Sequence, residues 1–347
     1  MFCITQTGEG VNMQLLSIIV PCYNEEEVIE ETYKRITAMF PKLGMDAELI
    51  FVNDGSRDKT MQMLTEFAMQ SPSIKVLSFS RNFGHQRAIT AGMDYSSGDA
   101  VIVIDADLQD PVEVIFEMVA KWREGFDVVY GKRIERKGES AFKKATAKAF
   151  YRLLSRLSEE PIPADVGDFR LIDRKVCNTL KQMPERSRYV RGLVAWLGYK
   201  TAYIEYVREP RFAGKTKYPL TKMIKLASDG VISFSYKPLK IASFSGVLVS
   251  IFSFIYLLYV LYEGLFTDNT ISGWTSTMAV LLFMCGIILS VLGIIGEYIA
   301  RIYEEVKARP IYVIDRSIGF NASEKISDPE NREARENDNA DNEKTDA

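Results

Sequence analysis

Residues 100–111 read AVIVIDADLQDP, and this stretch decides the fold. An apolar run rich in Val and Ile ends directly in Asp105 and Asp107, which predicts a short buried strand with two carboxylates at its carboxyl end. Asp110 is placed to cap a helix whose first position is Pro111. A buried strand that turns at once into a helix is typical of α/β proteins with a parallel sheet.

Similar apolar runs flank this stretch in both directions. They lie at 15–20, 48–52 and 75–79 before it, and at 127–130 after it. Segments with helical periodicity separate the first four runs, so a mostly parallel sheet covered on both faces is predicted. Ligands of open sheets of this kind bind beyond the carboxyl ends of the strands.

The residues that follow these runs carry oxygen ligands. Glu25 follows the first run, Asp54 the second, and Asp105 and Asp107 the fourth. Four carboxylates in one crevice repel one another unless a cation offsets their charge. Hard oxygen ligands of this kind suit Mg²⁺ or Mn²⁺, completed by water and a diphosphate.

Two longer apolar runs near the C-terminus, 241–262 and 274–296, contain no charged residue. Each is long enough to cross a bilayer as a helix, and buried core helices are the alternative. Lys237 and Lys240 precede the first run, while the connecting segment 263–273 has no Lys or Arg. By the positive-inside rule, both termini are expected in the cytosol and the connecting loop outside.

The remaining segments complete the expected domain organisation. Residues 219–240 have an apolar helical stripe between basic residues, which predicts a helix lying in the membrane interface or packing on the catalytic domain. The tail is polar and acidic, which is typical of disorder. The expected units are an N-terminal extension 1–14, an α/β domain 15–218, an amphipathic segment 219–240, spans 241–262 and 274–296 joined by loop 263–273, a cytosolic juxtamembrane segment 297–320 and a tail 321–347.

The ordered motifs SIIVPCYNE (17–25), VNDGS (52–56), SRNFGHQ (80–86) and DADLQDP (105–111) resemble those of glycosyltransferase family 2. Within that family the chain is similar to the polyprenyl-phosphate hexosyltransferases, which include bactoprenol glucosyltransferases and dolichol-phosphate mannose synthases. VGDFRL (166–171), the basic segment RFAGKTKY (211–218) and the two apolar runs favour the bactoprenol branch. The resemblance implies a Rossmann-like GT-A fold, inversion at the sugar carbon, and interfacial and transmembrane helices.

The resemblance also implies roles for individual residues. Asp168 would lie at the sugar, where a catalytic base is usually assigned, with Arg170 beside it and Asp107 at the diphosphate. A phosphate acceptor is largely deprotonated at neutral pH, so we expect Asp168 to orient the sugar or Arg170 instead. The nucleotide would be held by Pro21, Tyr23, Glu25, Asp54 and Asp105, the metal by Asp105, Asp107 and Gln109, and the lipid phosphate by Arg211, Lys215, Thr216 and Lys217.

Two further residues have alternative interpretations. Arg133 follows the fifth run and could clamp a phosphate, because guanidinium groups match phosphate oxygens; a solvated basic run is the alternative. His85 is the only histidine and lies in a loop near the expected nucleotide site, or at the surface.

Several classes of function are disfavoured. A net charge of −3 argues against a nucleic-acid binder governed by overall charge. A dinucleotide oxidoreductase would need Gly-x-Gly-x-x-Gly after the first run, and a processive polysaccharide synthase Gln-x-x-Arg-Trp and more spans; the sequence has neither motif. A non-catalytic scaffold of the same fold would not need the carboxylates that are present.

The sequence therefore predicts a multi-pass glycosyltransferase of the bacterial plasma membrane with a cytosolic active site. Its expected partners are a UDP-hexose, Mg²⁺ or Mn²⁺, polyprenyl (undecaprenyl) phosphate and the membrane, and its oligomeric state, a homo-oligomer included, is left open. UDP-glucose is the expected donor. N-acetylglucosamine, galactose and mannose stay open, because such sugars differ by groups that one or two buried hydrogen bonds distinguish.

Overall fold

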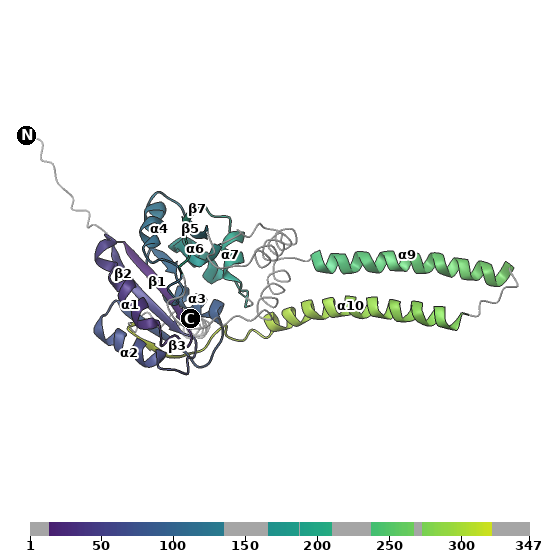
Figure 1. The fold of residues 1–347 in the computed structure, drawn as a ribbon, viewed down its shortest axis with the longest axis horizontal. Coiled ribbons are helices and arrows are strands. Elements are labelled where there is room, and N and C mark those ends of the chain that lie inside the picture. The colour runs from purple at the N-terminus through teal and green to yellow at the C-terminus, as the bar shows by residue number, and fades with distance from the viewer. Residues whose placement is uncertain (1–13, 135–165, 187, 210–236, 267–272, 321–347) are drawn as a thin grey trace, which may run out of the picture.

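The computed structural model describes residues 14–134, 166–186, 188–209, 237–266 and 273–320. An α/β domain and a pair of long helices make up these residues (Figure 1). The elements are β1 (Leu15–Cys22), α1 (Ile29–Thr37), a short 3-10 helix (Phe40–Lys42), β2 (Asp46–Asn53), α2 (Thr60–Gln70), β3 (Ile74–Phe79), α3 (His85–Tyr95), β4 (Ala100–Val103), α4 (Val114–Arg123), β5 (Val128–Arg133), β6 (Val166–Asp173), α6 (Arg174–Gln182), α7 (Val190–Trp196), β7 (Thr201–Tyr206), α9 (Lys237–Phe266), α10 (Trp274–Val306) and β8 (Ile314–Ile318).

One eight-stranded sheet, in the order β7-β5-β6-β4-β1-β2-β3-β8, organises the domain. β1 pairs in parallel with β2 and β4, β2 with β3, and β5 with β7. β6 runs antiparallel between β4 and β5, and β8 runs antiparallel beside β3. The five predicted strands are present, and the expected GT-A type of α/β fold with a mostly parallel sheet is confirmed.

The central strands are apolar on both faces because helices cover both faces. In β1, Leu16, Ile18 and Val20 face the cluster that α1, α2 and α4 complete, whereas Ile19 faces the cluster of α3, α6 and α7. Full burial of one such side chain contributes about 1.5 to 3 kcal/mol to stability. The sheet is thus a rigid support for the groups at its edges.

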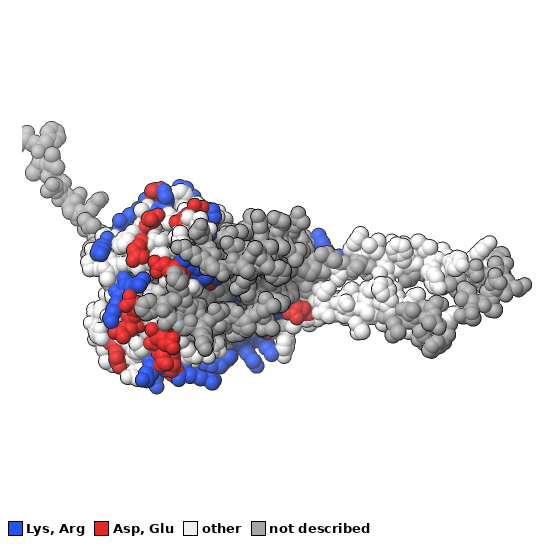
Figure 2. All heavy atoms as spheres, in the orientation of Figure 1, with Lys and Arg blue, Asp and Glu red and all other residues white. Residues whose placement is uncertain are grey.

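The two long helices, α9 and α10, lie side by side and extend away from the sheet (Figure 1). Figure 2 shows acidic and basic side chains over the α/β domain, while the described helices are uncharged along most of their length. Within the described part of the chain, one helical stretch is long and apolar enough to cross a membrane, Phe283–Val306, and Gly246–Tyr256 is a shorter apolar stretch. The predicted runs 241–262 and 274–296 thus lie within α9 and α10. Of these two helices, only α10 contains a described stretch that is long and apolar enough to cross a membrane.

The segment 297–320 differs from its expected description as a cytosolic juxtamembrane stretch. Its first part continues α10 to Val306, and its last part forms β8, which adds an edge strand to the sheet beside β3. The α/β domain therefore does not end before the long helices. Most of the expected amphipathic segment (219–236), the extension up to residue 13 and the tail lie outside the described residues.

Candidate active site

Most strands end at one edge of the sheet, and this edge gathers the predicted site residues. β1, β2 and β4 are parallel neighbours, so the residues after them lie at the same edge. Because β6 is antiparallel to β4, its first residues, including Asp168, come to that edge too. β5 and β7 also end there, which brings Arg133 and Tyr206 to the same place. The sheet topology thus collects groups from six strands.

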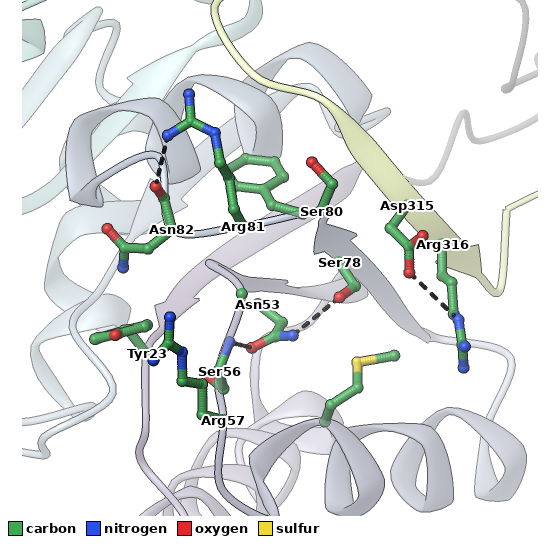
Figure 3. A pocket seen from close by; sticks show the side chains of 13 residues that line it. Tyr23, Asn53, Ser56, Arg57, Ser78, Ser80, Arg81, Asn82, Asp315 and Arg316 are labelled. Carbon is green, nitrogen blue, oxygen red and sulfur yellow. Dashed lines mark hydrogen bonds and ion pairs between the residues drawn. The ribbon is translucent and has the colours of Figure 1, made fainter.

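A pocket of about 450 Å³ lies at the ends of β1, β2 and β3 (Figure 3). Tyr23, predicted to hold the nucleotide, lines it together with Asn53 and Ser56. Pro21 lies within β1 at its carboxyl end. Gly55 has a positive φ of 67°, and a Cβ there would meet the backbone of Arg81 at 2.5 Å, so the turn after β2 requires glycine. The pocket has the position expected for a nucleoside.

Asp54, beside this pocket, is held by the backbone. Its carboxylate accepts hydrogen bonds from the N–H groups of Phe83 (2.6 Å) and Gly84 (2.9 Å). Burial raises the pKa of Asp54, and these two bonds act against that rise. Glu25 is half-buried, and its backbone N–H donates to Thr60 Oγ1 at 2.9 Å. Both predicted carboxylates thus lie next to the pocket.

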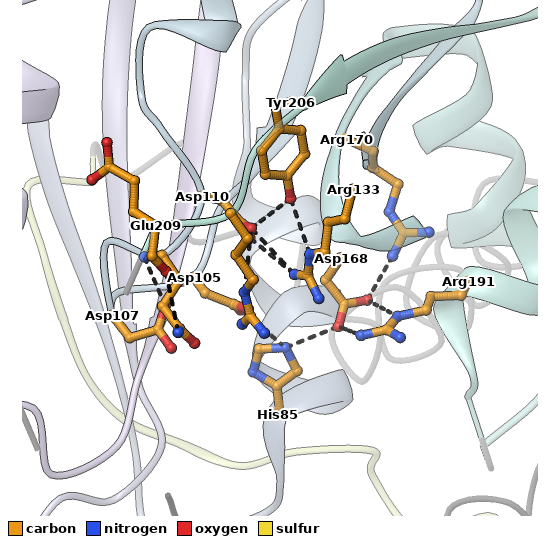
Figure 4. A network of polar contacts seen from close by, with 12 residues as sticks. His85, Asp105, Asp107, Asp110, Arg133, Asp168, Arg170, Arg191, Tyr206 and Glu209 are labelled. Atoms are coloured by element: carbon orange, nitrogen blue, oxygen red, sulfur yellow. Dashed lines mark hydrogen bonds and ion pairs between the residues drawn. The ribbon is translucent and has the colours of Figure 1, made fainter. Parts of the chain in front are cut away.

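Asp168 is the centre of a second group, in which one carboxylate meets two guanidinium groups and the imidazole of His85 (Figure 4). Arg191 reaches both of its oxygens, at 2.9 and 2.6 Å, and Arg170 donates at 2.9 Å. His85 Nε2 lies 3.2 Å from Oδ2. Burial alone would raise the pKa of Asp168, but Arg191 and His85 outweigh it and hold that pKa well below its ordinary value. Asp168 is therefore a poor proton acceptor.

Asp110 does not cap a helix, which corrects the prediction from its sequence position. α4 begins at Val114 with no side-chain cap. The Asp110 carboxylate instead accepts from Arg133 Nη2 at 3.2 Å and from the hydroxyl of Tyr206 at 2.5 Å. The side chain of Asp110 is fully buried, and a buried carboxylate needs such partners more than a helix end needs a cap. The geometry favours neither interpretation of Arg133 proposed from the sequence, because its guanidinium is part of this internal ion pair.

Gly167 explains how Arg133 reaches Asp110. A Cβ at residue 167 would lie 2.6 Å from Arg133 Nη2, so a larger residue there would require the guanidinium to shift from its place over β6. Arg208 lies beside the same ion pair, with Nε 3.9 Å from Asp110. The Nε of Arg208 is buried and has no hydrogen-bond partner among the residues that the structure describes.

Asp105 and Asp107 form the more open part of the site. The side chain of Asp105 is 27% exposed and lies 3.5 Å from His85 Nε2. Burial, with repulsion from Asp110, Asp168 and Asp107, raises the pKa of Asp105 to about 6 although His85 lowers it. Asp107 accepts from the Gln109 N–H at 3.2 Å. Gln109 turns its own amide toward the Glu209 carbonyl at 3.5 Å, at the limit of a hydrogen bond.

A divalent ion suits this part of the site. Within the ranges that the structure describes, no group of three or more His, Cys, Asp or Glu side chains is arranged to hold a metal. Mg²⁺ commonly uses only one or two carboxylates, with water and substrate phosphates as the other ligands. The carboxylates of Asp105 and Asp107 meet that requirement. The pKa of Asp105 is raised first by burial and then by neighbouring carboxylates, and a bound cation would offset the charge of those carboxylates.

Some residues could not be placed, and others were not predicted. Arg211, Lys215, Thr216 and Lys217 lie outside the described residues. Arg191, Arg208 and Tyr206 belong to the site but were missed, because their positions depend on the pairing of β5, β6 and β7 and on the packing of α7. The sequence signal for Arg191 was weak, because this residue lies in a basic stretch between Arg186 and Lys240 for which contact with anionic lipid headgroups is the better interpretation and a solvated face the alternative.

Comparisons with known proteins agree with this geometry. The family model described as glycosyl transferase family 2 matches residues 17–181, and the one described as GtrB C-terminal hairpin matches 237–302. The glycosyltransferase YkcC of Bacillus subtilis is 55% identical over 304 residues, which are 88% of this chain and 94% of that protein. The bactoprenol glucosyl transferase of Shigella phage SfII is 41% identical over 87% of this chain and 98% of that protein.

Solved structures resemble this chain at low sequence identity. Glucosyl-3-phosphoglycerate synthase from Mycobacterium tuberculosis, in complex with Mn²⁺, UDP-glucose and phosphoglyceric acid, is 21% identical, with a TM-score of 0.48 over 63% of this chain and 78% of that chain. A likeness of this size carries no information about the site. The relatives that match over most of their length and the two family models show that the chain is a glycosyltransferase that belongs to family 2, in the branch that includes the bactoprenol glucosyl transferases.

Proposed function

We propose that this enzyme transfers a hexose, with inversion, from a nucleotide-sugar to polyprenyl phosphate at the cytosolic face of the membrane. The observation that carries the proposal is the link between the site and the apolar helices. The backbone N–H of Arg186 donates to the Glu305 carboxylate of α10 at 3.0 and 3.1 Å, and Arg186 Nη1 donates to the Arg309 carbonyl. Five residues further on, Arg191 holds Asp168. An acceptor phosphate at headgroup level would thus lie near the sugar.

In the proposed reaction, an oxygen of the acceptor phosphate attacks the anomeric carbon while the bond from that carbon to the nucleoside diphosphate breaks. A phosphate monoester is mostly deprotonated at pH 7, so little proton remains to be removed. The pKa of Asp168 is held well below its ordinary value, so this carboxylate is a poor base. A permanently charged carboxylate is suited to hold other groups in place. We propose that it orients the sugar and holds the guanidinium groups of Arg170 and Arg191 at the reacting centre.

The same site must offset charge on the leaving diphosphate. Asp105 and Asp107 would hold Mg²⁺ or Mn²⁺, and the ion when bound supplies the positive charge that stabilises the departing phosphates. Arg208 is a second source of positive charge: its buried Nε lies beside Asp110 and has no hydrogen-bond partner within the described part of the chain. We propose that Arg208, in place of Arg133, contacts a substrate phosphate.

The donor that we propose is UDP-glucose. The support is the relationship to the bactoprenol glucosyl transferases and a pocket of nucleoside size at the ends of β1 to β3. Sugars that differ by one hydroxyl are distinguished by one or two buried hydrogen bonds, so UDP-galactose and UDP-N-acetylglucosamine are the nearest competitors. GDP-mannose is a more distant one.

We also propose that both long helices cross the membrane, with the termini in the cytosol. Phe283–Val306 meets the length and hydropathy of a span, and α9 lies against it as the second arm. Lys237 and Lys240 at the start of α9 favour a cytosolic start. Reporters fused after Gly264 should be exposed outside, and reporters fused after Arg309 should be exposed to the cytosol. The reverse pattern would contradict the orientation.

Purified enzyme in detergent, incubated with polyprenyl phosphate and each of the four nucleotide-sugars at equal concentration, tests the reaction. Glucose transfer should be fastest, and the product should be the β-linked lipid if the α-linked donor is inverted. Faster transfer of another sugar would contradict the donor but not the class of reaction. No transfer to the lipid from any donor would contradict the acceptor.

The acceptor has a separate test in the basic segment 211–218. Changing Lys215 and Lys217 together to Ala should raise KM for polyprenyl phosphate by about tenfold while the Kd for UDP stays constant, because two phosphate-binding cations are lost. A variant with normal acceptor kinetics and weakened UDP binding would assign these lysines to the diphosphate instead.

A further inference from the structure

The strand β8 has an unusual place in the chain, because it follows the long helices yet belongs to the sheet. The two matching family models end at residues 181 and 302, and β8 (Ile314–Ile318) lies beyond both. Only the residues between Val306 and Ile314 connect it to α10. Figure 3 shows that Asp315 and Arg316 of this strand stand at the side of the pocket opposite Tyr23. Part of the pocket wall therefore comes from a segment that the glycosyltransferase family model does not include.

The register of the sheet puts Arg316 in line with the polar residues of the pocket. Asn53 of β2 is the partner of Ser78 in β3, and Ser78 is the partner of Arg316 in β8. Side chains of residues paired in this way lie on the same face of a sheet. Asn53 Nδ2 already donates to Ser78 Oγ at 2.9 Å, so the row is polar and continuous as far as β8.

The contacts of Arg316 leave its guanidinium available for a ligand. Its Nε lies 3.4 Å from Asp315, and the two side chains are 72% and 56% exposed, so their pairing contributes little. Arg81, another arginine that lines the pocket, makes an additional contact: its guanidinium lies 4.1 Å from the centre of the Phe83 ring. Arg316 can exchange its contact with Asp315 for a ligand at small cost.

The distance from the proposed metal ligands shows which part of a nucleotide would meet Arg316. Asp105 follows β4, and β1, β2, β3 and β8 come next in the sheet. Adjacent strands are about 4.8 Å apart, so β3 lies about 14 Å from β4, which is the length scale of a nucleoside diphosphate. With the diphosphate at Asp105 and Asp107, the base would extend over β2 and β3, within reach of the long side chain on β8.

We propose that Arg316 recognises the base of the donor by donating a hydrogen bond to the O4 carbonyl oxygen of uracil. This inference rests on the proposed use of a uridine nucleotide and adds a residue that selects it. A guanidinium only donates hydrogen bonds, so it suits a carbonyl oxygen of uracil and does not suit the amino group that cytosine carries at the same position. The simpler role for a charged residue here is to prevent pairing of the exposed edge strand with another chain.

Calorimetric titration of the full-length protein in detergent with UDP and with CDP distinguishes these two roles. Arg316→Ala should weaken UDP binding by about tenfold, which corresponds to one hydrogen bond to a charged donor, and should change CDP binding much less. Ser317→Ala is the matched control, because Ser317 is on the same edge strand but pairs with Leu77 on the opposite face. Thermal unfolding of each variant checks that the fold is retained.

The outcomes separate this proposal from the proposed function. If the wild-type protein binds UDP and the Arg316→Ala variant binds it equally well, the role of Arg316 is overturned and the function stands. If the wild-type protein prefers GDP, the uridine donor is wrong, and the same variant is titrated with GDP: unchanged binding overturns the role of Arg316 in base recognition. Equal loss of UDP and CDP affinity overturns the carbonyl-specific contact. Equal weakening in the Ser317→Ala variant assigns the effect to the strand.

Discussion

Two pairs of carboxylates lie within one active site and differ in their burial and in their hydrogen-bond partners. Asp168 and Asp110 are almost completely buried, and each is surrounded by donors of this chain: Arg170, Arg191 and His85 for the first, Arg133 and Tyr206 for the second. Asp105 and Asp107 are half-buried. The pKa of Asp168 is held well below its ordinary value, whereas burial and neighbouring carboxylates raise the pKa of Asp105 to about 6.

The difference indicates that the two pairs of carboxylates have different roles. A buried carboxylate that its own chain neutralises is a structural support, because it fixes the cations around it. A carboxylate crowded by other carboxylates is suited to a cation from outside. The first pair would therefore position the substrate, and the second would bind the ion and the diphosphate. Substitutions of Asp168, Asp107 and Asp105, and of Tyr206 beside Asp110, test this difference.

The largest effect is expected for Asp168→Asn. The substitution leaves Arg170, 1% exposed, without its carboxylate partner, and an uncompensated buried charge costs about 3 to 5 kcal/mol. We expect a clear fall in the unfolding temperature together with loss of transfer activity. Thermal unfolding followed by tryptophan fluorescence measures the first, and the transferase assay measures the second. An unchanged unfolding temperature would contradict the supporting role of Asp168.

Asp107→Asn is the matched change in the other pair. Activity should fall on the order of a hundredfold, because an amide is a weaker ligand for a divalent ion at the leaving diphosphate. Stability should change by less than about 0.5 kcal/mol, since asparagine keeps an oxygen to accept the Gln109 N–H. Activity that survives both this substitution and EDTA would exclude the metal assignment.

Tyr206→Phe is a smaller change at the buried carboxylates, because it removes one hydrogen-bond partner of Asp110 and keeps the carboxylate. The hydroxyl of Tyr206 donates to Asp110 and accepts from Arg133 Nε at 3.1 Å. Its removal should lower the free energy of unfolding by about 1 kcal/mol and leave the dependence of activity on metal concentration unchanged. A shift in the dependence of activity on metal concentration would indicate that Asp110, like Asp105, takes part in metal binding.

The smallest effect is a pH dependence of stability that belongs to Asp105. Its folded pKa of about 6 lies above its ordinary value, so the native state binds the extra proton more tightly than the unfolded chain does. Its contribution therefore favours folding at low pH and is lost as pH rises through about 6. In EDTA, the wild-type protein should lose stability relative to Asp105→Asn between the ordinary pKa of an aspartate and the folded pKa of Asp105, from about pH 4 to about pH 6, and added Mn²⁺ should restore it. A constant difference would contradict the raised pKa.

Much of this molecule could be read from local patterns. The apolar run 100–104 and its counterparts predict the parallel strands, because burial on both faces demands continuous apolar residues. The polar residues Asp54, Asp105 and Asp107 directly follow such strands, so their gathering at one edge follows from parallel pairing. The two long apolar runs likewise become helices. In each of these cases the residues that cause the local structure lie within one short stretch of sequence.

Other features depend on segments that are far apart in the chain. The partner of Asp110 is Arg133 rather than the neighbouring helix end, because the pairing of β5 with β6 brings a guanidinium to the buried carboxylate. Arg191 reaches Asp168 only through the packing of α7, and β8 joins the sheet only after the chain has passed through α9 and α10. By itself, then, the sequence determined the strands, the helices and the acidic strand ends, since periodicity and burial act locally. The tertiary structure alone decided which carboxylate is neutralised and which is left for a ligand, because charge compensation depends on distances between residues that no local pattern contains.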